Sequence, residues 1–175
     1  AKKGINRFEW NLEQKGAWAK NKRRRYRNGP MALPGKYTAK LTVGNQSFEK
    51  QFEILMDPKL EGDGITMADL QAQQALQLKV IDLLSEARML QDKVEEKIKE
   101  LEKANASESQ LQPYKDILKE LKNDDGAYPE VVMVAQISYL YYILSSGDKV
   151  PGQEEKDRYQ ELLTQFNALK QKANL

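Results

Sequence analysis

The sequence predicts an α+β fold, in which a small three-stranded antiparallel β segment is followed by an up-and-down bundle of three or four helices. Two observations favour it. Apolar and polar residues alternate in the first third of the chain, as in strands with one buried face. Beyond that, apolar residues recur at helical spacing in runs joined by short connections, which favour antiparallel neighbours. We therefore expect a β segment at 1–56, a linker at 57–65 and a helical bundle at 66–175.

Three strands are expected in the β segment. Apolar and polar residues alternate in INRFEWNL (5–12), GKYTAKLTV (35–43) and QSFEKQFEILM (46–56), so each strand presents one apolar face. Gly44 begins the tight hairpin turn between the second and third strands. Trp10 is predicted to lie in the core of this sheet. The shared apolar face requires a cover.

Capping signals predict where the first two helices begin. Thr66, with Asp69 three residues on, has the pattern of a capping box. The helix that it starts meets neither proline nor glycine until after residue 104. At about 58 Å it should outreach its neighbours, bend or break. Ser107 and Gln110 form a second capping signal.

The third helix, expected over 130–146, is apolar on almost all sides and is predicted to be the most buried. Pro129 suits its first position, and Gly147 is predicted to end it in a left-handed cap. The fourth helix is expected to follow Pro151. Because the apolar stretch of the third helix is only about 21 Å long, no membrane span is expected.

Composition excludes several kinds of site. The sequence has no cysteine and no histidine, which removes disulfides, thiol nucleophiles, Cys/His zinc sites and the usual general base of serine or cysteine hydrolases. No metal and no cofactor is expected. The charge is uneven, because residues 1–56 hold 13 Lys/Arg against 4 Asp/Glu and residues 57–175 hold 15 against 22. Opposite signs suggest two modules with different surfaces.

The sharpest candidate for a binding site is the basic loop, residues 18–27. Arginine pairs with phosphate or sulfate through two parallel hydrogen bonds, and aromatic rings stack on bases or sugars. The alternative is a solvated loop between two strands, because no recognisable nucleic-acid-binding motif accompanies the charges. The candidate residues are Trp18, Lys20, Lys22, Arg23, Arg24, Arg25, Tyr26 and Arg27.

No catalytic carboxylates are predicted. General acid–base catalysis needs carboxylates held in a cleft. The adjacent acidic residues fall instead on predicted solvent faces or in turns, and the DDG sequence at 124–126 lacks the further ligands of a calcium loop. These pairs are Glu95 and Glu96, Asp124 and Asp125, and Glu154 and Glu155.

Polar and aromatic residues of the helices offer two weaker candidates. Tyr139, Tyr141 and Tyr142 either line a groove for a sugar or peptide or pack within a crowded, buried helix, which is the simpler interpretation. A buried polar network that sets the register of the bundle is expected among three residues. These are Gln73, Gln136 and Ser138.

Several stretches resemble one protein family. GINRFEWNL, GPMALPGKYTAKLTVGNQSFEKQFEILMDPKL, TMADLQAQQAL and YPEVVMVAQISYLYYIL are similar, in this order, to the C-terminal end of bacterial proteins with a BNR (Asp-box, sortilin-like) β-propeller. These proteins are often labelled glycosyl hydrolases of the sialidase-like kind. The resemblance covers most of the chain and implies that a propeller comes first, an immunoglobulin-like (Ig-like) β segment follows and a helical region closes the chain. Members are typically exported, so a periplasmic or extracellular location is expected.

The sequence lacks the motif that marks the propeller of this family. The Asp-box pattern S-x-D-x-G-x-T-W occurs nowhere in it, so no catalytic residue transfers to this chain, and the activity of the parent protein stays open. Three strands make only part of an Ig-like unit. We expect a non-catalytic C-terminal accessory module that packs on the propeller of its parent, with an uncovered strand edge that pairs with a second copy. The alternative is a module that binds a polyanion or a carbohydrate through residues 18–27.

Overall fold

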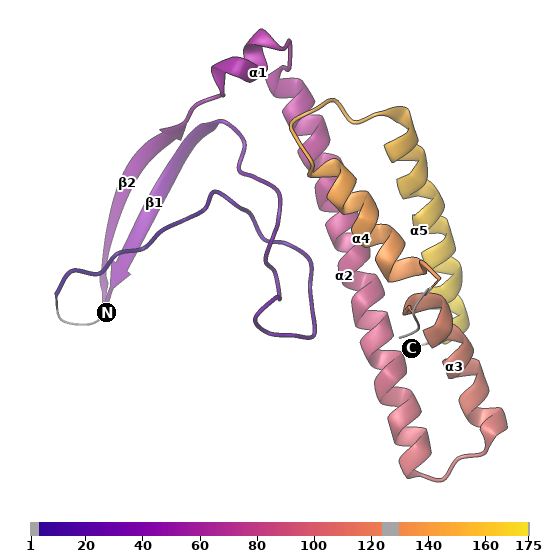
Figure 1. Cartoon of the computed structure of the whole chain (residues 1–175). Coiled ribbons are helices and arrows are strands. Elements are labelled where there is room, and N and C mark those ends of the chain that lie inside the picture. Colours follow the sequence, from indigo (N-terminus) through magenta and orange to yellow (C-terminus); the bar gives the residue numbers. More distant parts are fainter. Residues whose placement is uncertain (1–3, 124–129, 175) are drawn as a thin grey trace.

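The chain folds as a β-hairpin arm attached to a helical bundle (Figure 1). A computed structural model describes residues 4–123 and 130–174. The elements in chain order are β1 (Gly35–Val43), β2 (Gln46–Ile54), α1 (Pro58–Gly62), α2 (Met67–Lys103), α3 (Glu108–Leu121), α4 (Met133–Leu144) and α5 (Gln153–Ala173). The predicted α+β fold class is confirmed at this level.

The two strands form an antiparallel hairpin with one apolar and one polar face. Leu41 lies opposite Phe48 on the apolar face. On the polar face, Lys40 Nζ lies 3.2 Å from a carboxylate oxygen of Glu49. Gly44 has a φ of 59° in the turn, a conformation that glycine adopts without steric cost. The predicted alternation and the predicted turn are confirmed.

The predicted first strand is wrong. Residues 5–12 contain no strand, and the chain turns at residues 11–13. The side chain of Asn11 accepts a hydrogen bond from the amide of Glu13 at 3.2 Å, which is the geometry of a local turn. Leu12 then adopts a φ of 64°, a left-handed conformation that ends an extended segment. Alternating polarity in this stretch therefore does not produce a third strand.

Trp10 packs on the hairpin without being part of a buried core. Its ring centroid lies 5.9 Å from that of Tyr37 and 6.3 Å from that of Phe52, both in edge-on geometry. The side chain remains 39% exposed, and it covers only the end of the sheet near α1. An Ig-like sheet is not seen among the described residues.

The expected linker contains a short helix. The Asp57 carboxylate accepts a hydrogen bond from the amide of Lys59 at 2.9 Å, and Pro58 occupies the first turn of α1. α2 then begins at the predicted capping box. The amide of Thr66 donates to Asp69 Oδ2 at 2.9 Å, and the amide of Asp69 donates to Thr66 Oγ1 at 3.2 Å. Hydrogen bonds from the Thr66 side chain and backbone also lower the pKa of Asp69.

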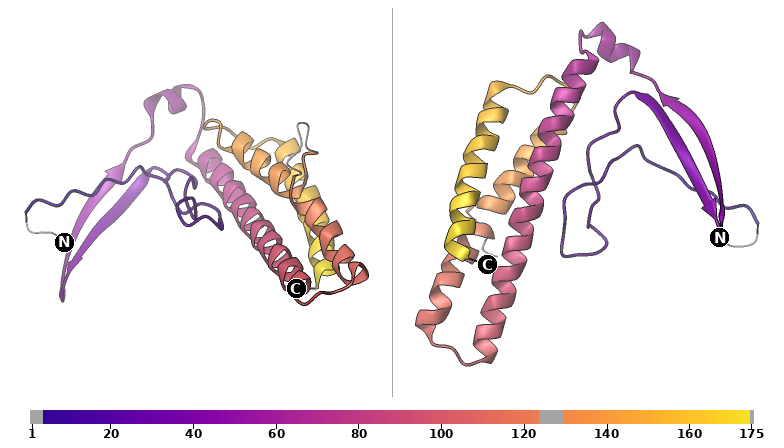
Figure 2. Two further views of the ribbon diagram at one scale, coloured as in Figure 1. Left: turned by 60° about the horizontal axis from the view of Figure 1, so that its bottom comes forward. Right: turned by 180° about the vertical axis from the view of Figure 1, so that it is seen from behind.

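α2 is the long helix against which the other bundle helices pack. It is continuous over 37 residues, about 55 Å long. α3 and α4 lie one after the other along α2, and both run antiparallel to it (Figure 2). These two helices form a broken second leg, and α5 returns beside them as the third. Ser107 and Gln110 form the second predicted cap, with the Ser107 amide donating to Gln110 Oε1 at 3.0 Å. None of the helices within the described residues has the length and apolarity to cross a membrane.

The end of α4 differs from the prediction. Gly147 does not adopt a positive φ, so the predicted left-handed cap is wrong. The helix ends at Leu144, whose carbonyl oxygen accepts hydrogen bonds from Gln73 Nε2 and Gln77 Nε2 of α2, each at 2.8 Å. Both glutamines are buried, so side chains of a neighbouring helix satisfy a carbonyl that the helix end leaves open.

The predicted network of Gln73, Gln136 and Ser138 is also wrong. Gln136 Oε1 accepts instead from Arg158 Nη2 of α5 at 2.8 Å. Ser138 Oγ donates to the carbonyl of Val134 in its own helix at 2.7 Å. Each polar side chain therefore satisfies a different group of the bundle.

The bundle core is one apolar cluster built from α2, α3, α4 and α5. α5 follows Pro151 as predicted. The largest fully buried side chains are Phe166, Leu121, Ile137, Leu144, Leu162, Val80 and Val94. The predictions for Pro129, Asp124 and Asp125 lie outside the described residues.

Candidate functional site

The basic loop is closed at its base by backbone pairing between residues 14–17 and 26–30, which we call the neck. Figures 1 and 2 place it in the angle between the hairpin and the bundle. The amide of Gln14 donates to the carbonyl of Pro30 at 2.8 Å, and Gly16 and Tyr26 are joined by an amide-to-carbonyl bond of 3.0 Å. Tyr26 in turn donates its amide to the carbonyl of Ala17 at 2.9 Å. Backbone pairing of this kind gives an irregular segment a defined shape.

Two glycines make the neck possible. A Cβ placed on Gly16 would lie 2.0 Å from the carbonyl oxygen of Arg27, and one on Gly29 would lie 2.3 Å from the carbonyl oxygen of Gln14. Both distances are far inside van der Waals contact. The two arms approach this closely only because neither glycine has a side chain.

The loop is anchored to α2. The amide of Trp18 donates to Ser85 Oγ at 3.0 Å, and Arg88 Nη1 donates to the carbonyl of Trp18 at 3.2 Å. Ala17, next to Trp18, is part of the buried core. Burial lowers the pKa of Arg88. These contacts fix the start of the loop on one face of the bundle.

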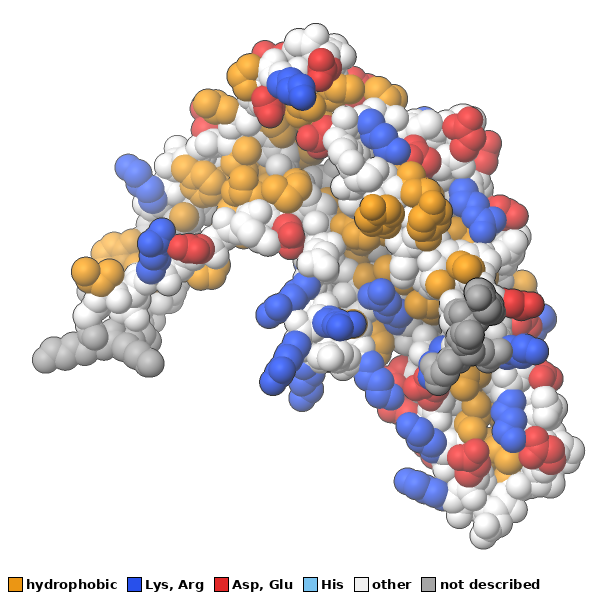
Figure 3. All heavy atoms as spheres, in the orientation of Figure 1, with side chains coloured by type: hydrophobic (Ala, Val, Ile, Leu, Met, Phe, Trp, Pro, Cys, Tyr) orange, Lys and Arg blue, Asp and Glu red, His pale blue; other side chains and the backbone are white. Residues whose placement is uncertain are grey.

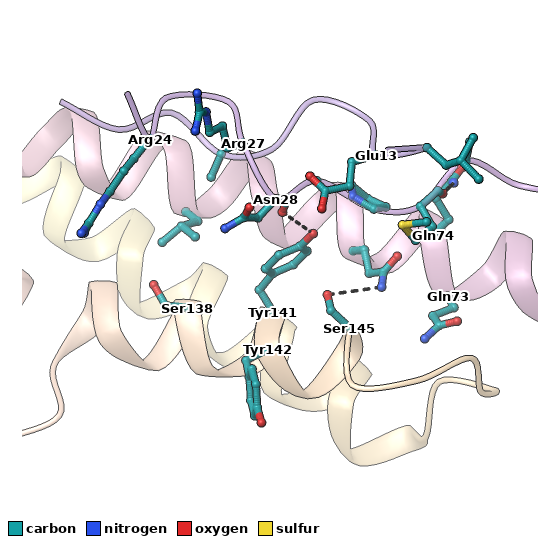
Figure 4. A pocket seen from close by; sticks show the side chains of 18 of the residues that line it. Glu13, Arg24, Arg27, Asn28, Gln73, Gln74, Ser138, Tyr141, Tyr142 and Ser145 are labelled. Atoms are coloured by element: carbon teal, nitrogen blue, oxygen red, sulfur yellow. Dashed lines mark hydrogen bonds between the residues drawn. The ribbon is translucent and has the colours of Figure 1, made fainter. Parts of the chain in front are cut away.

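The end of the loop is anchored to α4. The hydroxyl of Tyr141 donates to the carbonyl of Asn28 at 2.8 Å (Figure 4). Burial raises the pKa of this hydroxyl above its ordinary value. Gln74 of α2 holds the following segment through a 2.7 Å bond to the carbonyl of Met31. The sequence did not predict these long-range contacts, because nothing in a local pattern identifies their partners.

Two cations of the basic loop stabilise its own conformation. Lys20 Nζ forms an ion pair with Asp92 of α2 and lies 3.9 Å from a carboxylate oxygen of Glu95. The hydrogen bond to Asp92 is the main cause of the raised pKa of Lys20. Arg25 Nε donates to the carbonyl of Ala19 at 2.8 Å, and its guanidinium lies 5.1 Å from the ring centroid of the half-buried Trp18. The side chains of Lys20 and Arg25 therefore stabilise the loop itself.

Four other cations face solvent. Among the described residues, the side chains of these four have no ion pair or hydrogen-bond partner, and all four are exposed. They are Lys22, Arg23, Arg24 and Arg27. Figure 3 shows Lys and Arg side chains gathered over this loop between the hairpin and the bundle. Tyr26, also exposed, lies under Lys15, whose Nζ is 3.9 Å from its ring centroid.

A groove of about 1460 Å³ runs between the basic loop and helices α2 and α4. Its lining includes Arg24, Arg27, Ser138 and Tyr142. Figure 4 shows Arg24 reaching from the loop toward the side of α4 that carries Ser138, while Arg27 points outward. The groove therefore joins the free cations to the surface of α4.

The tyrosines of α4 do not follow the predicted burial. Tyr139 and Tyr142 are 63% and 68% exposed, with ring centroids 6.4 Å apart and planes inclined by 23°. Only Tyr141 is half-buried. The spacing of residues 139 and 142 places both on one helical face, but hydropathy alone does not show which face of an apolar helix lacks a neighbour.

Glu95 and Glu155, one from each of two predicted pairs, have structural partners, although Glu95 also lines the groove. Glu95 interacts with Lys20 and with Lys122, whose Nζ lies 3.7 Å away. Glu155 Oε2 accepts from the amide of Gly152 at 2.7 Å, which caps α5. No group of three or more Asp, Glu, His or Cys residues in the described ranges is placed to hold a metal ion.

Comparison with known proteins identifies no relative. No protein-family model, curated protein or solved structure matches this chain. The resemblance to BNR β-propeller proteins therefore stays a prediction from the quoted stretches of sequence. Function has to be argued from the hairpin, the basic loop and the groove.

Proposed function

We propose that the chain is a non-catalytic accessory module of an exported β-propeller protein, which docks on the rest of that protein through its hairpin. The observation that carries the proposal is the exposed apolar face of the two-stranded sheet. Leu41 is 61% exposed and Phe48 is 56% exposed, although they face each other across the hairpin. An isolated hairpin is marginally stable in water, and an apolar sheet face is stable only when another layer covers it.

The hairpin suits a docking role because its two faces differ. The polar face of the hairpin carries the ion pair between Lys40 and Glu49. On the same face, Thr42 Oγ1 lies 3.1 Å from Ser47 Oγ. A partner sheet would therefore cover one face and leave the other in water. Lys50 shares the apolar face, opposite Ala39, and a charge there discourages unspecific stacking. In this proposal the partner is the propeller-bearing part of the parent protein, in the periplasm or outside the cell.

Sedimentation velocity over a concentration series tests the exposed face. The unmodified chain is expected to form concentration-dependent dimers through the uncovered face or edge of its hairpin. A Leu41→Ser/Phe48→Ser variant should stay monomeric. The matched control, Thr42→Ser/Gln51→Ser, changes the polar face and should associate like the unmodified chain. A strict monomer at every concentration, with no binding of a dye that reports apolar surface, would contradict the proposal.

A second candidate function is the binding of a polyanion or carbohydrate through the basic loop. The supporting observation is that Lys22, Arg23, Arg24 and Arg27 are free of partners within the described residues, on a loop anchored at both ends. A preformed loop loses little conformational entropy when it binds. Affinity for a sulfated polysaccharide should fall as salt rises and should depend on these four side chains. Salt-independent binding, or none at low salt, would remove this candidate.

A further inference from the structure

The tyrosine pair of α4 is an exposed aromatic surface with no structural task among the described residues. Tyr139 and Tyr142 stack on each other and are each more than half exposed. The buried residues of α4 are Met133, Ile137, Leu140 and Leu144, which occupy the opposite side of the helix. Exposed aromatic rings on a rigid helix are positioned to stack on planar ligand groups.

One ring of the pair lies at the groove that the free cations line, and the other ring lies outside its lining. Tyr142 lines the same groove as Arg24 and Arg27, and the bond from Tyr141 to Asn28 fixes the loop on this helix. α4 contains no charged residue between Met133 and Leu144, and the groove carboxylates Asp92 and Glu95 of α2 interact with Lys20. The groove therefore leads from the guanidinium groups to Tyr142, on which Tyr139 stacks.

Two serine hydroxyls close to the tyrosines in the sequence donate to backbone carbonyls. Ser138 Oγ donates to Val134 at 2.7 Å, and Ser146 Oγ donates to Ile143 at 2.8 Å. These two serine hydroxyls are therefore already engaged within their own helix and its end. Nucleobases need only a flat π surface, because stacking without base-specific hydrogen bonds binds every base.

We propose that the basic loop and the tyrosine pair bind single-stranded nucleic acid. The phosphates would pair with Arg23, Arg24 and Arg27, and successive bases would stack on Tyr139 and Tyr142. This inference rests on the second candidate function, because it names the polyanion that the basic loop would bind. It does not depend on the docking of the hairpin.

Fluorescence anisotropy with a labelled oligothymidylate of roughly 15 nucleotides tests the inference. The full chain is titrated between about 50 mM and about 200 mM salt. An Arg23→Gln/Arg24→Gln/Arg27→Gln variant is expected to flatten the log–log salt dependence by about 2, which corresponds to about 0.7 for each lost phosphate contact. A Tyr139→Ser/Tyr142→Ser variant is expected to bind about tenfold or more weakly without a change in the salt dependence.

Two controls separate binding from folding and from net charge. Tyr139→Phe/Tyr142→Phe keeps both rings and should bind like the unmodified chain. A Lys93→Gln/Lys99→Gln/Lys103→Gln variant removes the same number of charges from exposed positions of α2 and should retain the affinity. Circular dichroism of each variant establishes that the bundle is intact.

The outcomes distinguish this inference from the function on which it rests. Binding that depends on the arginines but not on the tyrosines would overturn the stacking site and leave a general polyanion site. Binding of a labelled heparin fragment, but not of the oligonucleotide, with the same dependence on the arginines would overturn nucleic acid as the ligand. Binding of neither probe at low salt would overturn both.

Discussion

The hydroxyl of Tyr141 donates a 2.8 Å hydrogen bond to the carbonyl of Asn28, which joins helix α4 to the end of the basic loop. This bond and the 3.0 Å bond from the Trp18 amide to Ser85 Oγ hold the loop at its two ends. The tip between them carries the unpaired cations. Anchored ends and a charged tip are what a preformed binding loop requires.

Replacing Tyr141 by Phe should loosen the end of the loop. The Asn28 carbonyl would lose its donor, so we expect the free energy of unfolding to fall by about 1 kcal/mol. Amide hydrogen exchange should increase at residues 27–30 and stay unchanged in the core of α2. Tyr142→Phe is the control, since the Tyr142 ring is exposed. Equal exchange in the two variants would show that the bond does not hold the loop.

The two neck glycines should be intolerant of any side chain. Gly16→Ala would place a Cβ 2.0 Å from the carbonyl oxygen of Arg27, so the neck has to open. We expect the free energy of unfolding in urea to fall by about 1–3 kcal/mol. Gly147→Ala serves as the control, because a Cβ there meets nothing within 4 Å. If both variants unfold at the same urea concentration, the close approach of the two arms is not a constraint.

The buried glutamines of α2 should matter more than their exposed neighbour. Gln73→Ala removes a donor to the carbonyls of Leu144 and Gly147, at 2.8 and 2.6 Å, and leaves a cavity. We expect a loss of about 1–3 kcal/mol in the free energy of unfolding. Gln71→Ala, on the exposed side of the same helix, should change it by less than about 0.5 kcal/mol. Thermal and urea unfolding give both values, and equal losses would contradict the capping role of Gln73.

Stability should decrease in alkaline solution through two tyrosines. Burial raises the pKa of Tyr141 and of Tyr159 above the value of an exposed tyrosine. Because the folded state favours the neutral phenol, this contribution is complete below the unfolded pKa near 10 and is lost as pH rises through the folded pKa. Urea unfolding from about pH 8 to about pH 11 should therefore show falling stability. Tyr141→Phe should show a smaller fall, and an identical pH dependence would count against the buried phenol.

Local signals in the sequence predicted local structure well. The capping boxes at Thr66 and Ser107 and the turn at Gly44 were all confirmed, because each depends on residues within a few positions. The prediction of a first strand was wrong because a strand also depends on a pairing partner, which a local pattern does not identify. Alternation at 5–12 indicates a strand, yet Leu12 adopts a left-handed conformation and, among the residues that the structure describes, these positions pair with no strand.

The candidate site was predictable in composition but not in geometry. The charges of the basic loop are evident in the sequence, but the commitment of Lys20 to Asp92 depends on a helix 72 residues away. The exposure of Tyr139 and Tyr142 depends on which side of α4 its neighbours leave open. Such facts follow from tertiary packing, which periodicity does not encode.

The docking role of the hairpin is tested by hydrogen exchange of its amides, in this chain alone and in a longer protein that carries the proposed propeller. Amides of β1 and β2 are expected to exchange rapidly in the isolated chain, while those of α2 are protected. In the longer protein, a covering sheet should slow the hairpin amides by about 100-fold or more. Hairpin amides that are as protected as those of α2 in the isolated chain, or equally fast in both proteins, would contradict the role of the hairpin as a docking arm.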